Sequence, residues 1–122
     1  MQITRQDDKE ALEELNIQIG VEESKGDDES RRWLGGVIAS KLAFRRGDGI
    51  TIDNREEFLR KVTPSDFRET KVESIDIHGD RAVVTCIVIL KSAAGDKKFH
   101  NLRLFLQQEG KWKLLGWANE KL

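Results

Sequence analysis

Residues 99–118, FHNLRLFLQQEGKWKLLGWA, decide the fold of this chain. Apolar and polar residues alternate on both sides of a break at Glu109-Gly110, which predicts two antiparallel strands joined by a tight turn. Glycine at the second turn position supplies the positive φ that a type I′ hairpin requires. With Glu109 and Gly110 as the two loop residues, Phe105 lies opposite Leu114, and directly opposed residues share a face of the sheet.

This register divides the hairpin into two faces. One face carries three apolar side chains and two polar ones: Phe105, Leu114, Trp112, Arg103 and Asn101. The other face carries five apolar side chains: Leu102, Leu104, Leu106, Leu115 and Trp117. Both faces are largely apolar, so both should be covered, and the helices of so short a chain can cover only one of them. The pattern therefore predicts a homodimer that forms through the second face.

The composition bounds the class of protein. A chain of 122 residues is expected to form one domain, 1–122, with a core at about residues 11–118. The net charge of −1 gives no reason to expect a nucleic-acid partner. The first residues contain no apolar targeting run, and no stretch approaches a membrane span. We therefore expect a cytoplasmic protein that does not enter a membrane.

Metal and cofactor chemistry have little support in the sequence. The single Cys86 excludes an internal disulfide and a cysteine-cluster metal site, and its apolar strand predicts a core or interface residue. His78 falls at a predicted turn and His100 on the outer face by parity, without a carboxylate cluster at ligand spacing. We predict no metal and no cofactor.

Residues 11–25 read as the main helix, with Leu12, Leu15 and Ile19 forming an apolar stripe at helical spacing. The stripe continues onto Glu22 and Glu23, where a helix that faces the core would normally have apolar residues. Either the last turn has left the core and is solvated, or a carboxylate points into a cavity. The sequence leaves both interpretations open.

The other elements follow in a simple order. A short helix at residues 29–34 precedes a small hairpin formed by 37–44 and 50–52. A third helix is predicted at 54–62, because Asp53 followed by Glu56 resembles a capping box. Two more strands, 67–77 and 81–91, complete a four-stranded antiparallel meander with the hairpin described above. The prediction is an α+β domain with its helices on one face of the sheet.

Several motifs, taken in this order, resemble the nuclear transport factor 2-like superfamily, in its SnoaL-like and uncharacterised bacterial branches. The resemblance spans about residues 11–117 and also extends to the association domain of calmodulin-dependent kinase II. The motifs that carry it are Lys25-Gly26-Asp27, Phe44 before Asp48-Gly49, Glu57-Phe58-Leu59, Gly79-Asp80-Arg81-Ala82-Val83-Val84 and Glu109-Gly110-Lys111-Trp112-Lys113-Leu114.

The resemblance implies a cystatin-like cone, in which a curved sheet wraps around the long helix and leaves a pocket at one end. Members of the superfamily commonly pair through the outer sheet face, which agrees with the homodimer predicted above. Arg103 matches the position of a pocket arginine in the kinase association domain. A second arginine of that domain corresponds to Ile89 here, which argues against a strongly cationic pocket.

Arg103 is the first candidate for a functional residue. A buried guanidinium among apolar side chains needs a partner, which Glu22 or Glu23 could supply within the chain. A bound carboxylate ligand could supply it through a bidentate contact instead. Asn101 lies on the same face and could also bind a ligand. The predicted apolar lining of the pocket consists of Trp33, Phe44, Phe105 and Trp112.

A catalytic residue is harder to name. The predicted inner face of the last three strands includes Thr85, Ile87 and Ile89 but no acid and no histidine, and the chain has no tyrosine. An isomerase, cyclase or dehydratase would therefore use Glu22 or Glu23 as a base of raised pKa, with Arg103 stabilising an enolate. Three hypotheses remain. They are a domain that binds a small hydrophobic or carboxylate molecule, an enzyme of this kind, and an oligomerisation module without a working pocket.

Overall fold

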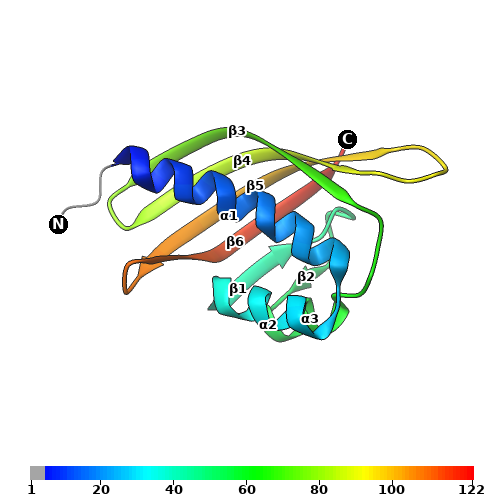
Figure 1. Cartoon of the computed structure of the whole chain (residues 1–122), viewed down its shortest axis with the longest axis horizontal. Coiled ribbons are helices and arrows are strands. Elements are labelled where there is room, and N and C mark those ends of the chain that lie inside the picture. Colours follow the sequence, from blue (N-terminus) through cyan, green and yellow to red (C-terminus); the bar gives the residue numbers. More distant parts are fainter. Residues whose placement is uncertain (1–4) are drawn as a thin grey trace.

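Six strands form one curved sheet, and three helices lie against one of its faces in the described part of the chain (Figure 1). The structure, a computed structural model, describes residues 5–122. The predicted α+β cone is confirmed. In chain order the elements are α1 (Arg5–Lys25), α2 (Asp28–Val37), β1 (Ile38–Arg45), β2 (Ile52–Asp53), α3 (Arg55–Lys61), β3 (Arg68–His78), β4 (Arg81–Leu90), β5 (Lys97–Gln108) and β6 (Lys111–Lys121).

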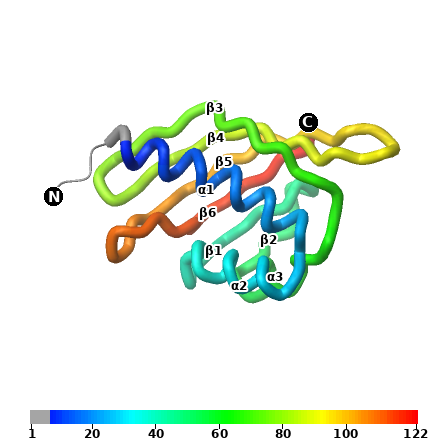
Figure 2. Tube along the Cα trace, viewed as in Figure 1, coloured from blue at the N-terminus to red at the C-terminus, as the bar shows by residue number. Residues whose placement is uncertain are grey.

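The strands are arranged in the order β2-β1-β6-β5-β4-β3. The antiparallel meander from β3 to β6 and the small β1–β2 hairpin are confirmed. β1 also pairs with β6, and this pairing is parallel, so the sheet is mixed. As Figure 2 shows, the chain leaves β1, passes through β2 and α3, and only then enters the meander.

The turn between β5 and β6 has the predicted geometry. Glu109 and Gly110 have φ angles of 52° and 78°, both in the left-handed region that a type I′ turn requires. The predicted pairing of Phe105 with Leu114 is also confirmed.

The register predicted beyond this point is wrong. Leu115 is an extra residue in β6, because Phe105 pairs with Leu114 while Leu104 pairs with Gly116. Such a bulge moves every later residue of the strand to the opposite face. Trp117 therefore pairs with Arg103 on the inner face and is buried, whereas the sequence placed it on the outer face. The Leu104 side chain packs over Gly116, where a Cβ atom would lie 3.2 Å from Leu104 Cδ1.

α1 is longer than predicted and buries Leu12 and Ile19. It ends at Lys25, and the next residue, Gly26, has a φ of +58°. A Cβ atom on Gly26 would lie 2.1 Å from the carbonyl carbon of Thr63, so the residue is fixed both by its backbone conformation and by a close approach of the chain. This contact joins the end of α1 to the segment that follows α3.

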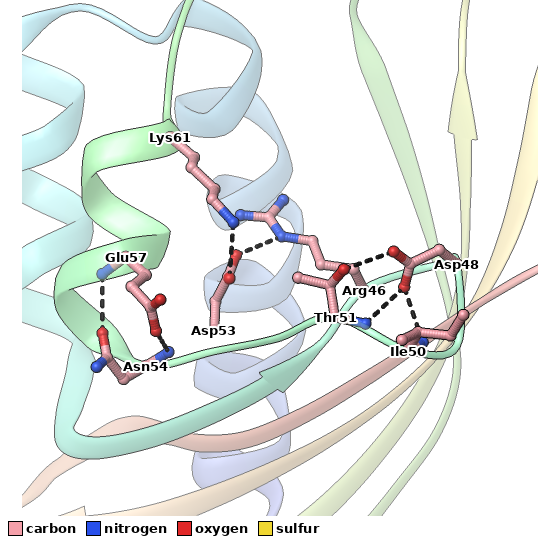
Figure 3. A network of polar contacts seen from close by, with 8 residues as sticks. All are labelled: Arg46, Asp48, Ile50, Thr51, Asp53, Asn54, Glu57 and Lys61. Atoms are coloured by element: carbon pink, nitrogen blue, oxygen red, sulfur yellow. Dashed lines mark hydrogen bonds and ion pairs between the residues drawn. The ribbon is translucent and has the colours of Figure 1, made fainter.

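α3 begins one residue later than the capping prediction. The capping box consists of Asn54 and Glu57, each of which accepts a hydrogen bond from the backbone N–H of the other (Figure 3). The predicted pair, Asp53 and Glu56, is therefore wrong. The shift leaves the Asp53 carboxylate available to other donors.

The core lies between the helices and the inner face of the sheet. Phe44, Phe58 and Trp117 form an aromatic cluster at one end, in which Phe44 stacks on Trp117 at 4.1 Å between ring centroids. Trp112 closes the other end, where its Nε1 donates a hydrogen bond of 3.1 Å to Asp8. Among residues 5–122, no helix combines the length and the apolar character needed to cross a bilayer.

Candidate functional site

A cavity of about 210 Å³ lies between the end of α1, the turn after β1 and the inner face of the sheet. Its polar lining consists of Glu23, Arg46, Arg68, Asn101, Arg103 and Asn119. Its apolar lining includes Phe44, Val88, Leu90, Phe99 and Trp117. The cavity therefore combines three arginines and one carboxylate with an apolar wall.

Arg103 is fully buried, and its partners among residues 5–122 are neutral. Nη1 donates to Oδ1 of Asn16 at 3.0 Å and to its backbone oxygen at 3.4 Å, while Nη2 donates to Oδ1 of Asn101 at 3.2 Å. The guanidinium also lies 4.6 Å from the centre of the Trp117 ring. Nε has no hydrogen-bond partner in this part of the chain.

The amides around Arg103 are themselves held in place. Oδ1 of Asn101 accepts from Trp117 Nε1 at 2.5 Å as well as from Arg103. Nδ2 of Asn101 donates to Oδ1 of Asn119 at 3.2 Å. In α1, Nδ2 of Asn16 donates to the Leu12 carbonyl oxygen at 2.7 Å, which turns Oδ1 towards Arg103. The guanidinium is thus fixed in a rigid neutral frame.

The two glutamates at the end of α1 have different surroundings. Glu22 accepts hydrogen bonds from Ser30 Oγ at 2.9 Å and from Gln18 Nε2 at 2.6 Å, so it joins α1 to α2. Glu23 lines the cavity, with Oε2 3.9 Å from Arg68 Nε. Burial raises the pKa of Glu23, although Arg68, Arg103 and Arg46 each oppose the rise. Of the two interpretations above, the carboxylate in a cavity holds for Glu23.

Arg46 and Lys61 meet at Asp53, whose side chain is 1% exposed (Figure 3). Arg46 Nε donates to Oδ2 at 2.6 Å and Lys61 Nζ donates to Oδ1 at 2.8 Å. Burial alone raises the pKa of Asp53, but the hydrogen bonds from Lys61 and Arg46 outweigh it, so the pKa lies below its ordinary value. The Arg46 guanidinium also lies 4.6 Å from the centre of the Phe44 ring.

A smaller cavity of about 90 Å³ adjoins the first and shares Glu23, Arg46 and Arg68 with it. Lys61 and Ser65 contribute to the lining of this second space. Nη1 of Arg68 donates to Ser65 Oγ at 2.7 Å and to Ser24 Oγ at 3.2 Å, which anchors the arginine at the junction. The two cavities together form a cationic site that extends from Arg103 to Lys61.

Comparison with solved structures identifies the fold. A protein of unknown function from Silicibacter pomeroyi has a TM-score of 0.80 at 18% identity, with 98% of this chain and 100% of that chain covered. A candidate dehydratase from Streptomyces avermitilis has a TM-score of 0.79 at 18% identity, with coverages of 98% and 99%. Both are described as nuclear transport factor 2-like. This chain has the nuclear transport factor 2-like fold.

A third structure of this fold, a candidate calmodulin-dependent kinase II association domain from Exiguobacterium sibiricum, has a TM-score of 0.75 at 17% identity. It is covered over 97% of its length, with 100% of this chain aligned. No protein-family model and no curated protein matches the sequence.

The nuclear transport factor 2-like cone brings only part of the predicted pocket together. Arg103, Asn101 and Phe44 line the cavity, as expected. Phe105 and Trp112 lie in the core away from its lining, and Trp33 is half-buried on α2 beside the core.

The inner face predicted for β4 is also wrong. Val84 pairs with Arg103 and Cys86 with Asn101, so Val84, Cys86 and Val88 point inwards. Thr85, Ile87 and Ile89 consequently belong to the outer face, because they pair with Leu102, His100 and Lys98 of β5. The comparison of Ile89 with a pocket arginine therefore has no structural basis.

The expectation against a strongly cationic pocket is also wrong because Arg46 and Arg68 line the cavity together with Arg103. Arg46 comes from the turn after β1, and Arg68 from the first residue of β3. Neither has a periodic or motif signal, because each reaches the cavity only through tertiary packing. Asn119 was missed because the bulge at Leu115 brings it to the inner face.

The outer face of the sheet is partly exposed in the described part of the chain. Leu102 and Leu104 are 41% and 43% exposed, and Leu106 and Leu115 are half-buried. His100 lies on the same face, with Nε2 3.6 Å from Glu73 Oε1. No group of three or more potential metal ligands occurs among the described residues.

Proposed function

We propose that this domain binds a small organic anion in the cavity, with the negative group of the ligand on Arg103. The observation that carries the proposal is a fully buried guanidinium whose hydrogen-bond partners among residues 5–122 are neutral. A buried charge without a direct ion pair is costly, and a bound carboxylate would provide both the charge and a bidentate acceptor. The unpartnered Nε of Arg103 is a further donor for such a ligand.

The shape and lining of the cavity support a ligand with an apolar part. A volume of about 210 Å³ corresponds to roughly seven water molecules, so a ligand of about ten non-hydrogen atoms fits. Phe44, Phe99 and Val88 provide an apolar wall for its carbon skeleton. Asn119 offers an amide at the same site.

Trp117 provides the test, because it lines the cavity while Trp33 and Trp112 do not. Tryptophan fluorescence and titration calorimetry with phenylacetate should report saturable binding to the wild-type protein. Arg103→Met should weaken this binding at least tenfold, since a hydrogen bond to a charged group contributes about 1.5–3 kcal/mol. Arg32→Met, which removes an exposed arginine on α2, is the matched control and should bind like wild type. Equal affinity in Arg103→Met and wild type would disprove the role of Arg103.

We also propose that the protein is a homodimer formed through the outer sheet face. Leu102 and Leu104 are exposed and form an apolar ridge beside the small residues Gly116 and Ala118. This arrangement leaves room for the same ridge of a second copy, which supports the dimer. If no small anion binds and the dimer forms, the domain acts as an oligomerisation module, the alternative that the sequence left open.

A second function is favoured by Glu23. It is a cavity carboxylate whose pKa is raised by burial, and Arg103 lines the same cavity. Glu23 would act as the base that removes a proton next to a carbonyl, with Arg103 stabilising the enolate. The test is exchange of α-protons of a small keto acid in D₂O, followed by NMR. Glu23→Gln should abolish exchange while ligand binding persists; exchange at the wild-type rate would exclude this role.

A further inference from the structure

We propose that the ligand is a dianion with two separated negative groups, a short dicarboxylate. This inference rests on the anion-binding function proposed above and specifies its substrate class. One carboxylate would lie on Arg103, and the second would lie at the junction of the two cavities, near Arg46 and Lys61.

The balance of charge around the site supports this proposal. Arg46, Lys61, Arg68 and Arg103 line the two adjoining cavities, against Glu23 and the buried Asp53 that contacts two of them. Within residues 5–122, four cationic side chains face two carboxylates, so the site carries two more positive than negative charges. A monocarboxylate would neutralise one of them, and a dicarboxylate would neutralise both.

The two surplus charges lie at different ends of the site. Glu23 pairs with Arg68, and the single carboxylate of Asp53 is shared by Arg46 and Lys61, so one surplus charge belongs to that pair. The other belongs to Arg103, which lines only the larger cavity, whereas Lys61 lines only the smaller one. Separated positive charges match a ligand with a negative group at each end better than a compact anion such as phosphate.

The wall between these ends fits a short carbon chain. Phe44 stacks on Trp117, and these rings line the cavity beside both Arg46 and Arg103. Methylene groups of a dicarboxylate would pack against the two rings while its ends reach the cations.

The experiment compares dicarboxylates with monocarboxylates of equal chain length. Succinate, glutarate and adipate are titrated against butyrate, pentanoate and hexanoate by calorimetry at constant ionic strength, with inorganic phosphate as the compact anion. At least one dicarboxylate should bind about tenfold or more tightly than its matched monocarboxylate, because it gains a second charge-assisted contact. Lys61→Met should lower this preference about tenfold. Lys111→Met, which removes a lysine at the exposed β5–β6 turn, should retain it.

Each result decides between the proposals. Equal affinity for the paired acids would overturn the dianion inference and leave the anion-binding function intact. Phosphate binding more tightly than every dicarboxylate would overturn the separation of the two groups. Binding of none of these anions would overturn both the inference and the function on which it rests. An unchanged preference in Lys61→Met would remove the second cationic end from the proposal.

Discussion

The guanidinium of Arg103 lies 4.6 Å from the centre of the Trp117 ring, and the two residues pair directly across β5 and β6. This relationship depends on the extra residue Leu115, which brings Trp117 to the inner face. The same bulge brings Asn119 to Asn101, the acceptor of both Arg103 and Trp117. One inserted residue therefore assembles much of the frame around the buried charge.

Arg103→Met should preserve the fold while it removes anion binding. The change removes the cost of a desolvated charge but leaves Asn16 Oδ1 without its donor, so we expect the free energy of unfolding to change by less than about 2 kcal/mol. Urea denaturation of the two proteins without ligand gives the comparison. A loss of more than about 2 kcal/mol would mean that the Asn16 and Asn101 hydrogen bonds make Arg103 a structural residue.

Asp53→Asn should destabilise the domain at neutral pH by about 1–3 kcal/mol, because it removes the shared counter-charge of Arg46 and Lys61. The pKa of Asp53 is lowered in the folded protein, so its stabilising effect is complete above its ordinary pKa of 3.8 and is lost as the pH falls through the folded pKa. Urea unfolding at neutral and at strongly acidic pH should therefore show the two proteins converging in acid. A constant difference would show that the carboxylate charge is irrelevant.

Gly26→Ala should be among the most destabilising single-methyl changes in the chain. Its φ of +58° disfavours a side chain, and the new Cβ atom would lie 2.1 Å from Thr63. We expect a loss of about 2 kcal/mol or more, measured by thermal denaturation followed by circular dichroism. Gly36→Ala is the matched control, since nothing lies within 4 Å of its Cβ position, and alanine there should stabilise α2 by up to about 1 kcal/mol. Similar melting temperatures for the two variants would contradict the contact at Thr63.

Local patterns in the sequence were sufficient for the elements whose geometry is local. The turn at Glu109-Gly110 and the meander were predicted because turn chemistry and alternation act between neighbours. The parallel pairing of β1 with β6 was missed because it joins distant segments and leaves no local signal. The bulge at Leu115 was missed for a related reason, since Leu115-Gly116-Trp117 continues the apolar run without a break.

The candidate site shows the same limit. Alternation placed Arg103 and Asn101 correctly on the inner face, and the helical stripe pointed to Glu22 and Glu23. The stripe could not show which of the two glutamates faces the cavity, because the partners of Glu22 come from both α1 and α2. Arg46 and Arg68 lie in a turn and at the start of a strand, so only the folded chain brings them to the cavity.

Leu104→Glu should convert the proposed dimer to a monomer. The residue is 43% exposed in the middle of the outer face, where a buried carboxylate without a partner would be costly. Light scattering coupled to size-exclusion chromatography measures the mass directly. Ile50→Glu is the control, because Ile50 is 84% exposed in the loop between β1 and β2. A Leu104→Glu protein with the mass of wild type would show that the outer face is not the interface.

Anion binding should be coupled to protonation of Glu23. Burial already raises the pKa of Glu23 above its ordinary value of 4.5. A ligand carboxylate beside Glu23 disfavours the ionised form of this residue, so binding should raise its pKa further. Affinity is then expected to increase as the pH falls through the pKa of free Glu23, and binding near this pH should take up protons. Calorimetry in buffers of different ionisation enthalpy measures the uptake. Glu23→Gln removes the titrating group while keeping the shape of the side chain, and its affinity should be nearly independent of pH over the same range. Proton uptake that persists in Glu23→Gln would assign the coupling to another group and separate Glu23 from the bound anion.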